Sequence, residues 1–263
     1  MTEAAVLYEV EDAIATVTLN RPDNRNSMTR DVLEGLGDAV RKICDDKSVR
    51  CVIITGRGKS FCAGADFKDQ PAVDDNAPVL QPHERSYAIY QNFLSLLEIE
   101  VPVIAAMQGH AIGGGLGLAV VCDLRVANCD ARYGANFVRL GLHPGMSMTY
   151  LLPRLMGVPR AVEFLLTGRI VSGKEAADAG LVHYAVDRDQ VIEKARELAR
   201  EIAGAAPLAV RWTKRSIYNG LDWNPARAAE HEAHAQSRSM ETEDFREGIS
   251  ALLSRREPKF VGK

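Results

Sequence analysis

The stretch GHAIGGGLGLAVVCD, residues 109–123, has four glycines among the five positions 113–117 and follows the apolar run VPVIAAMQ. A second turn poor in side chains, FCAGADFK at residues 61–68, comes shortly after the apolar run CVIITG. Small residues directly after a buried strand let the backbone approach a ligand or another segment closely. The two turns therefore mark the places where this chain either packs tightly or binds something.

The composition is that of one large domain, or of a core with an appendage. The 263 residues carry 32 Lys and Arg and 35 Asp and Glu, and a net charge of −3 lacks the basic excess typical of nucleic-acid binding. Five cysteines without a CxxC pair indicate reduced thiols and a cytoplasmic location. No signal peptide, membrane span or metal-ligand spacing is evident, so we expect neither a membrane span nor a metal site.

Strands alternate with helices up to about residue 186, and helices alone follow. This order predicts an α/β core over residues 1–204 and a helical C-terminal region over residues 205–263, which packs on the core or on another subunit. The alternating residues 6–12 and 13–22 predict a hairpin. Further strands are predicted at residues 49–56, 102–109, 123–134 and 180–186, and helices at residues 29–46, 83–100, 158–168, 172–180 and 187–204.

Three details of this prediction are specific enough to test. Thr29 is placed to cap the helix that follows it, and Ser172 and Glu175 have capping-box spacing. The helix at residues 83–100 is expected to turn Tyr90, Phe93, Leu94 and Leu97 inward. The proline-rich, acidic residues 69–82 predict a mobile loop and show no further pattern.

The glycine turns do not match the common phosphate-binding or nucleophile motifs. GRGKS at residues 56–60 has Ile53 where a P-loop needs its first glycine, and GGGLG does not give GxGxxG. GMSMT at residues 145–149 lacks the second glycine of a nucleophile elbow.

Chemistry on an acyl thioester offers a use for both turns. Reaction at the α-carbon, the β-carbon or the carbonyl puts negative charge on the thioester oxygen, and two backbone N–H groups can stabilise it. Gly114 is expected to open a helix, where N–H groups are free, and Ala65 offers an N–H from the other turn. The alternative is that the glycines only allow a helix to pack closely on a strand.

Six ordered segments resemble the enoyl-CoA hydratase/isomerase (crotonase) superfamily over nearly the whole chain. They are LNRPDNRNSM (19–28), SFCAGADFK (60–68), GHAIGGGLGLAVVCDLRVA (109–127), LGLHPGMSMTYLLPRLMG (140–157), TGRIVSGKEAADAGLV (167–182) and PKFVGK (258–263). The resemblance implies a crotonase-type spiral of ββα units with a helical C-terminal trimerisation region. It also implies a homo-oligomer, either a trimer or a dimer of trimers.

The same resemblance implies which residues form the site. The N–H groups of Ala65 and Gly114 would be the oxyanion donors. The ligand would be an acyl-CoA, as substrate or bound molecule, without a further cofactor. The expected acyl-CoA contacts are Ala63, Gly64 and Asp66 at the adenine end, Arg25 and Lys259 or Lys263 at the phosphates, and Gly113, Gly117 and Phe137 in the pocket.

The chain departs from the family at the acid and base positions. Gly117 and Phe137 stand where a hydratase of this family has its two glutamates, and Gly145 stands where some isomerases and dehalogenases have an aspartate. Syn addition of water needs a base and an acid, so the usual hydration mechanism is not expected. His143 is the candidate replacement, or a histidine packed in its turn. Tyr87 and Tyr90 lie on the helix expected to cover the acyl pocket, or serve only as packing.

Three functions fit these observations. The first is an acyl-CoA enzyme of the crotonase type with atypical acid and base groups, acting by isomerisation, decarboxylation, carbon–carbon cleavage or thioester hydrolysis. The second is a non-catalytic acyl-CoA-binding or regulatory protein that kept the pocket. The third is a structural partner within a hetero-oligomer of the same fold.

Overall fold

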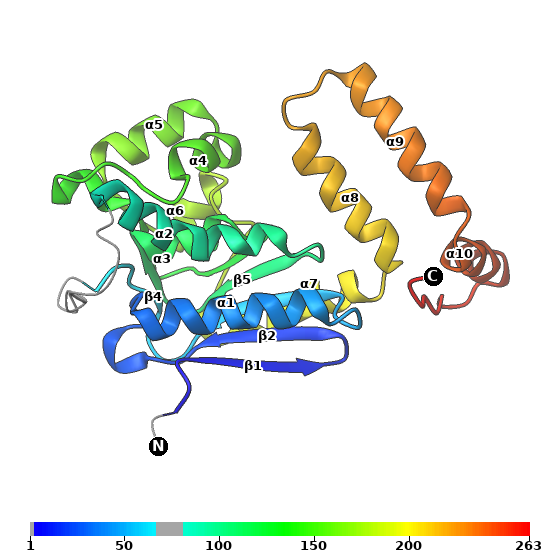
Figure 1. Ribbon diagram of the computed structural model, residues 1–263, viewed down its shortest axis with the longest axis horizontal. Coiled ribbons are helices and arrows are strands. Elements are labelled where there is room, and N and C mark those ends of the chain that lie inside the picture. The colour runs from blue at the N-terminus through cyan, green and yellow to red at the C-terminus, as the bar shows by residue number, and fades with distance from the viewer. Residues whose placement is uncertain (1–2, 67–80) are drawn as a thin grey trace.

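The computed structural model describes residues 3–66 and 81–263, and the predicted loop at residues 69–82 lies almost wholly outside them. The strands form two sheets, which confirms the α/β class (Figure 1). The six-stranded sheet has the order β1 (Val6–Glu11), β2 (Ile14–Leu19), β3 (Cys51–Gly56), β5 (Val103–Met107), β7 (Leu124–Asn128) and β10 (Tyr184–Val186). The four-stranded sheet has the order β4 (Ser60–Cys62), β6 (His110–Ile112), β8 (Arg132–Gly134) and β9 (Ile170–Ser172).

Ten α-helices and four short 3-10 helices are described in residues 3–66 and 81–263. The α-helices are α1 (Arg30–Asp45), α2 (Pro82–Leu94), α3 (Gly114–Val120), α4 (Met148–Met156), α5 (Val158–Thr167), α6 (Gly173–Asp178), α7 (Val191–Ala203), α8 (Pro207–Gly220), α9 (Pro225–Met240) and α10 (Glu243–Ser254). The 3-10 helices are η1 (Pro22–Asn24), η2 (Ser95–Glu98), η3 (Asn136–Leu140) and η4 (Arg188–Gln190). None of the helices within these two ranges is both long and apolar enough to cross a membrane.

The six-stranded sheet is buried on both faces, and this explains the unbroken apolar run of β3. Side chains alternate across a strand, so Cys51 and Ile53 pack with α7 while Val52 and Ile54 pack in the cluster that includes α1. The predicted hairpin is confirmed, because β1 and β2 pair antiparallel from Val6 opposite Leu19 to Glu11 opposite Ile14. Strands β2, β3, β5, β7 and β10 are parallel.

The second sheet corrects the sequence prediction. The predicted single strand at residues 123–134 is two strands, β7 and β8, which lie in different sheets. Strand β6 was not expected between the apolar run and the second glycine turn. Three-residue strands carry too little periodicity to be recognised in a sequence.

The helix details were confirmed in part. The Ser172 and Glu175 capping box at α6 is confirmed, and α5 ends at Gly168 in the left-handed conformation. Thr29 is at the N-cap of α1, but its hydroxyl donates to the Asp31 carboxylate and caps no backbone N–H. Leu97 was expected inward and is 53% exposed, because the chain leaves α2 after Leu94 and continues as η2.

Helices α8, α9 and α10 extend away from the sheets, with α8 and α9 antiparallel to each other (Figure 1). An ion pair connects α8 to the core: Lys214 Nζ lies 2.7 Å from Asp123 Oδ2 and 2.9 Å from the carbonyl oxygen of Val101. Asp123 Oδ2 also accepts from the N–H of Val103 at 2.7 Å. The division of the chain at residue 204 remains a prediction.

Candidate functional site

The two glycine turns meet in the structure. A Cβ on Gly64 would lie 2.7 Å from the carbonyl oxygen of Ile112 and 3.0 Å from the amide nitrogen of Gly114, and Gly64 has a left-handed φ of +85°. A Cβ on Gly115 would lie 1.9 Å from the carbonyl oxygen of Cys62. Only glycine at positions 64 and 115 permits the two turns to approach so closely. The approach places the amide nitrogen of Gly114 beside Gly64, the residue that precedes Ala65.

The N–H groups of Ala65 and Gly114 are both available. Neither donates a hydrogen bond to any residue within the ranges 3–66 and 81–263. Gly114 is the first residue of α3, where no intrahelical acceptor exists, and it is buried, whereas Ala65 is exposed. Two donors from separate turns, next to small residues, are what a developing oxyanion requires.

The N-terminal loop is bonded to the first turn. The N–H of Met28 donates to the carbonyl oxygen of Gly64 at 2.9 Å, and the N–H of Ala63 donates to that of Arg25 at 3.1 Å. Buried Asn26 fixes this loop, because its side chain donates to the carbonyl oxygens of Arg57, Ser60 and Phe61 and accepts from the N–H of Arg21. The sequence reasoning missed Asn26, and the tolerance of Asn for left-handed φ was the available signal.

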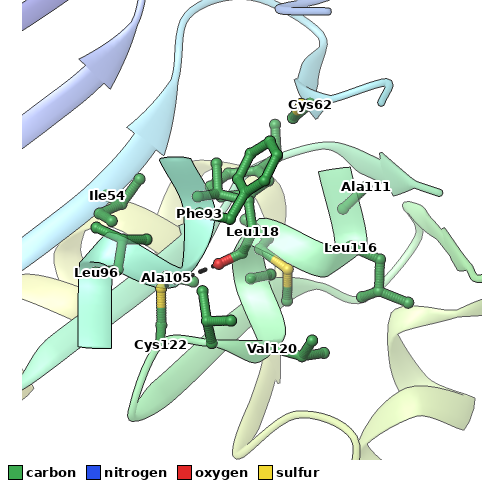
Figure 2. Packing of buried hydrophobic residues seen from close by; sticks show 14 of the residues in the cluster. Ile54, Cys62, Phe93, Leu96, Ala105, Ala111, Leu116, Leu118, Val120 and Cys122 are labelled. Atoms are coloured by element: carbon green, nitrogen blue, oxygen red, sulfur yellow. Dashed lines mark hydrogen bonds between the residues drawn. The ribbon is translucent and has the colours of Figure 1, made fainter. Parts of the chain in front are cut away.

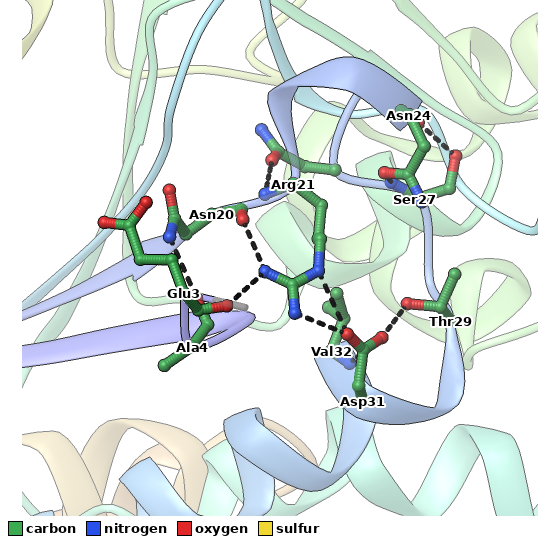
Figure 3. A network of polar contacts seen from close by, with 10 residues as sticks. Glu3, Ala4, Asn20, Arg21, Asn24, Ser27, Thr29, Asp31 and Val32 are labelled. Carbon is green, nitrogen blue, oxygen red and sulfur yellow. Dashed lines mark hydrogen bonds and ion pairs between the residues drawn. The ribbon is translucent and has the colours of Figure 1, made fainter. Parts of the chain in front are cut away.

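Figure 3 shows how Arg21 holds the start of the same loop. Its guanidinium forms an ion pair with Asp31 at 2.8 Å and donates to the carbonyl oxygens of Glu3 and Asn20. Asp31 in turn accepts from the hydroxyl of Thr29 and the N–H of Val32. The guanidinium and the adjacent hydrogen bonds lower the pKa of Asp31 against a raising effect of burial, so this carboxylate stays ionised near neutral pH.

Met146 occupies the space beside the position where the family has a glutamate. A Cβ on Gly117 would lie 2.5 Å from Met146 Sδ, and a Cβ on Gly114 would lie 2.7 Å from Met146 Cε and 2.8 Å from Met28 Sδ. Met146 is buried and has a φ of 57°, which is uncommon for a residue other than glycine. The sequence reasoning missed both methionines.

Phe137 itself occupies the second of the positions at which a carboxylate was looked for, and Tyr90 lies beside the third, Gly145. The Phe137 Cζ atom would be 3.9 Å from a Cβ on Gly113, so its ring edge faces the second glycine turn. The hydroxyl oxygen of Tyr90 would be 2.3 Å from a Cβ on Gly145. A thioether, a phenyl ring and a phenol therefore lie at or beside positions 117, 137 and 145, and the thioether of Met28 lies beside Gly114.

Tyr87 and His143 have exposed side chains. Tyr87 is 58% exposed. His143 is also exposed, and its Nδ1 lies 2.7 Å from the carbonyl oxygen of Pro144. When this nitrogen carries the proton and donates to Pro144, the free lone pair is at Nε2.

Arg25 lines a cavity of about 930 Å³ next to the first turn. The same cavity is lined by Ala63, which precedes Gly64, and by Ile112, which precedes Gly113. Lys59 and Arg132 line it as well. None of these three cations has an ion-pair partner among residues 3–66 and 81–263. Burial, and then the charges of Arg132 and Arg25, lower the pKa of His110 in the same group.

Asp66 is half-buried and directly follows Ala65, at the end of the first described range. Lys259 and Lys263 lie elsewhere, on a tail that is bonded to α10 and to the start of β3. The carbonyl oxygen of Phe260 accepts from Arg50 Nη2 at 2.7 Å, whereas the first glycine turn lies near Gly56, at the other end of β3. Six strand residues span about 20 Å, so the structure does not bring Lys259 together with Arg25 in one chain.

Cys62 lies directly beneath the site but is no nucleophile candidate. Burial raises the pKa of the Cys62 thiol to about 12, so it stays protonated at neutral pH. Figure 2 shows Cys62 with Phe93 of α2 and Leu118 of α3 in the hydrophobic core. This cluster packs α2 and α3 together and so positions Tyr90 relative to Gly114.

Comparison with known proteins shows to which family the chain belongs. The model of the family described as enoyl-CoA hydratase/isomerase matches residues 9–263. A crotonyl-CoA hydratase of Syntrophomonas wolfei is 36% identical over 260 residues, covering 98% of both chains, and a short-chain-enoyl-CoA hydratase of Clostridium acetobutylicum is 35% identical over 254 residues, covering 95% of both. The crystal structure of an enoyl-CoA hydratase from Bacillus anthracis superposes with a TM-score of 0.91 at 34% identity, covering 98% of this chain and all of that one, which confirms the predicted crotonase fold.

Proposed function

Because the chain belongs to the enoyl-CoA hydratase/isomerase family, we propose that it is an acyl-CoA enzyme that stabilises a thioester oxyanion or enolate with the N–H groups of Ala65 and Gly114. The observation that carries the proposal is the contact between the two glycine turns, since a Cβ on Gly64 would lie 3.0 Å from the Gly114 nitrogen. Two unpartnered donors on fixed backbone stabilise charge at a thioester oxygen without reorganising. A cytoplasmic location is part of the same proposal.

The acid and base groups differ from those of a hydratase. No carboxylate lies at position 117, 137 or 145, and Met146 and Phe137 place a thioether and a phenyl ring beside the second glycine turn. Hydration by a pair of glutamates is therefore not the proposed reaction. His143 remains a candidate base, with Nε2 as the atom that would accept a proton.

The basic cavity supports the proposed contact of Arg25 with the coenzyme A phosphates. Arg25, Lys59 and Arg132 line one cavity that reaches Ala63 at the first turn. Cations without acidic partners suit phosphate groups, and guanidinium groups bind them through two hydrogen bonds at once. We place Ala63, Gly64 and Asp66 at the adenine end, while Lys259 belongs to the site only if it comes from a second copy of the chain.

A trimer or dimer of trimers is the proposed assembly. An apolar groove of about 610 Å³ lies between α8 and the core, lined in part by Leu97, Trp212 and Ile217. On α10, Leu252 and Leu253 are 73% and 79% exposed. Apolar surface of this kind is typical of interaction sites, and light scattering of the purified protein measures the assembly directly.

The second candidate function is a non-catalytic acyl-CoA-binding protein. The observation that favours it is the filling of the carboxylate positions by apolar groups, which leaves the oxyanion donors intact but removes ordinary proton transfer. Incubation with saturated, enoyl and malonyl-type acyl-CoAs in D2O, followed by mass spectrometry and a binding assay, separates the two candidates. Deuterium uptake, loss of CO2 or release of free coenzyme A supports the enzyme, whereas tight binding with no mass change supports the binding protein.

A further inference from the structure

One peptide unit carries both an anchored carbonyl group and a proposed oxyanion donor. The carbonyl oxygen of Gly64 and the N–H of Ala65 belong to the same trans peptide, in which they point in opposite directions. The N–H of Met28 donates to that carbonyl oxygen at 2.9 Å. This hydrogen bond restrains the peptide plane and directs the Ala65 N–H away from Met28. It also polarises the peptide, which strengthens the N–H as a donor.

Met28 also contacts the second proposed donor. Its Sδ atom lies 2.8 Å from the point that a Cβ on Gly114 would occupy. The backbone of Met28 thus binds the peptide of one donor, while its side chain packs against the residue of the other. The relative position of the two N–H groups therefore depends on where the chain places Met28.

Asn26 anchors this loop two residues earlier. Its side chain is fully buried, and its amide nitrogen donates to the carbonyl oxygens of Arg57, Ser60 and Phe61 at 3.0, 2.9 and 3.2 Å. The Oδ1 atom of Asn26 accepts from the N–H of Arg21 at 2.8 Å. Three carbonyl oxygens at one end and an N–H at the other leave a single orientation for the carboxamide.

The anchored carbonyl groups lie on the strand that leads into the first glycine turn. Ser60 and Phe61 belong to β4, which continues directly into Ala63. The N–H of Ala63 donates to the carbonyl oxygen of Arg25, the residue before Asn26, at 3.1 Å. The Asn26 side chain and the backbone next to it thus connect the loop to the turn.

The backbone of the loop is strained at the same place. Arg25 and Asn26 have left-handed φ values of 61° and 55°. Such conformations in residues other than glycine persist only where surrounding contacts hold them, and they concentrate at functional sites. The four hydrogen bonds of the Asn26 side chain supply these contacts.

We propose that Asn26 is a positioning residue for the oxyanion hole, an inference that rests on the proposed function above. It holds the loop so that the Met28 N–H orients the peptide of Ala65, and because it is fully buried it contacts no substrate. Without the carboxamide, the two donors are no longer directed at one oxygen. The resulting defect lies in the polarisation of the bound thioester and not in the affinity for the ligand.

The test observes the thioester carbonyl of a bound ligand. A saturated acyl-CoA with a heavy carbon isotope at the thioester carbonyl is bound to the full-length protein, and isotope-edited infrared spectroscopy gives the C=O stretching frequency. Two aligned N–H donors should lower this frequency in wild type relative to the free ligand. Asn26→Gly is expected to return it part of the way to the free value, because glycine accepts the left-handed φ but lacks the side-chain hydrogen bonds.

Kinetics and hydrogen exchange of Asn26→Gly test the same chain of contacts. Loss of a whole oxyanion donor lowers kcat by about 10²- to 10³-fold, so misdirection of one donor should lower kcat by about 10-fold. KM should change little, because the interaction that is weakened belongs to the transition state. The N–H of Met28 should exchange faster than in wild type, since its hydrogen bond to Gly64 is no longer held in place.

Asn20→Gly is the matched control. Asn20 is also buried, and its carboxamide donates to the carbonyl oxygen of Ala4 at 2.9 Å and accepts from Arg57 Nη1 at 3.0 Å. These partners lie outside β4 and the glycine turns. The control should lower the free energy of unfolding but leave the carbonyl frequency and kcat unchanged. An equal frequency shift in both variants would overturn the specific role of Asn26.

The remaining outcomes separate this inference from the proposed function. An Asn26→Gly protein that folds and keeps the wild-type carbonyl frequency overturns the role of Asn26 alone. If it does not fold, Asn26→Asp, which keeps the shape and offers at most one proton to the three carbonyl oxygens, is measured with the same expectation. A wild-type complex with the carbonyl frequency of the free ligand overturns the oxyanion hole, and failure to bind any acyl-CoA overturns the proposed function.

Discussion

Met146 Sδ lies 2.5 Å from the point that a Cβ on Gly117 would occupy. The thioether thus stands beside the position of a missing carboxylate, and Met146 Cε approaches Gly114, the proposed oxyanion donor, in the same way. Met146 would have to shift to admit a longer side chain at position 117, because its Sδ, Cβ and Cγ atoms lie 2.5, 3.1 and 3.4 Å from that point. The first two predictions follow from this relationship.

Gly114→Pro removes one proposed oxyanion donor while keeping the start of α3. Proline is tolerated at the first position of a helix, so the fold is expected to persist. Turnover of any acyl-CoA substrate should fall by about 10²- to 10³-fold, as for other lost oxyanion donors. Gly114→Ala is the control, since it adds the same Cβ beside Met146 and keeps the N–H. Equal activity of the two variants, measured as kcat, contradicts the oxyanion assignment.

Hydratase activity should require three substitutions and not two. Gly117→Glu with Phe137→Glu restores the carboxylates, but the new side chain at position 117 collides with Met146. We expect hydration of a crotonyl-type thioester only when Met146→Ala is added, because space and both proton-transfer groups are then present. Loss of the conjugated thioester absorbance measures the reaction. Equal activity of the double and triple variants would show that Met146 does not block the position.

His143→Ala tests the second candidate for proton transfer. If Nε2 of His143 accepts the substrate proton, turnover should fall by about 10²-fold in this variant, the usual size of a general-base contribution. His143 is exposed, so its removal should not alter the unfolding midpoint. Turnover equal to that of wild type would show that His143 is not the base.

Lys214→Met should loosen the attachment of α8 to the core. The ion pair with Asp123 has side chains only 14% and 15% exposed, and the substitution leaves a largely buried carboxylate without its cation. We expect the free energy of unfolding to fall by about 3 kcal/mol, the lower end for buried pairs that lose one partner. The double variant Lys214→Met with Asp123→Asn should recover part of this loss in urea unfolding. A decrease in the free energy of unfolding of less than about 0.5 kcal/mol would show that this ion pair contributes no more than an exposed ion pair does.

Glu247 should make the attachment of the C-terminal tail sensitive to acid. It pairs with both Nη atoms of Arg256 and accepts from the N–H of Lys259 at 2.7 Å, and these hydrogen bonds lower the pKa of Glu247 to about 2. Because the folded pKa is below the ordinary value of 4.5, the stabilisation is complete above pH 4.5 and is lost as the pH falls towards 2.

The measurement for this tail is hydrogen exchange of the Lys259 N–H at two pH values, corrected for the intrinsic rate. Protection in wild type should decrease between pH 4.5 and pH 2. Glu247→Gln should show lower protection at pH 7 and little further change on acidification. Protection in wild type that is independent of pH over this window would contradict the assignment.

The sequence by itself determined the α/β class, the hairpin, the buried central strands and the helical end of the chain. These features follow from local patterns that each element displays within its own residues, such as the unbroken apolar run of β3 and the helical periodicity of α7. It also marked the two glycine turns and the absence of a carboxylate at positions 117, 137 and 145. The absence of a side chain is visible in a sequence without any knowledge of the fold.

Only the tertiary structure decided what replaces those carboxylates. Met146 and Tyr90 reach Gly117 and Gly145 from a different element or a different part of the chain, and no local pattern relates them. The three-residue strands β6 and β8, the anchoring by Asn26 and the distance of Lys259 from Arg25 are decided in the same way. These contacts join residues that are distant in the sequence, and they depend on how the helices and strands pack together. The periodicity of side chains within one element contains no information about that packing.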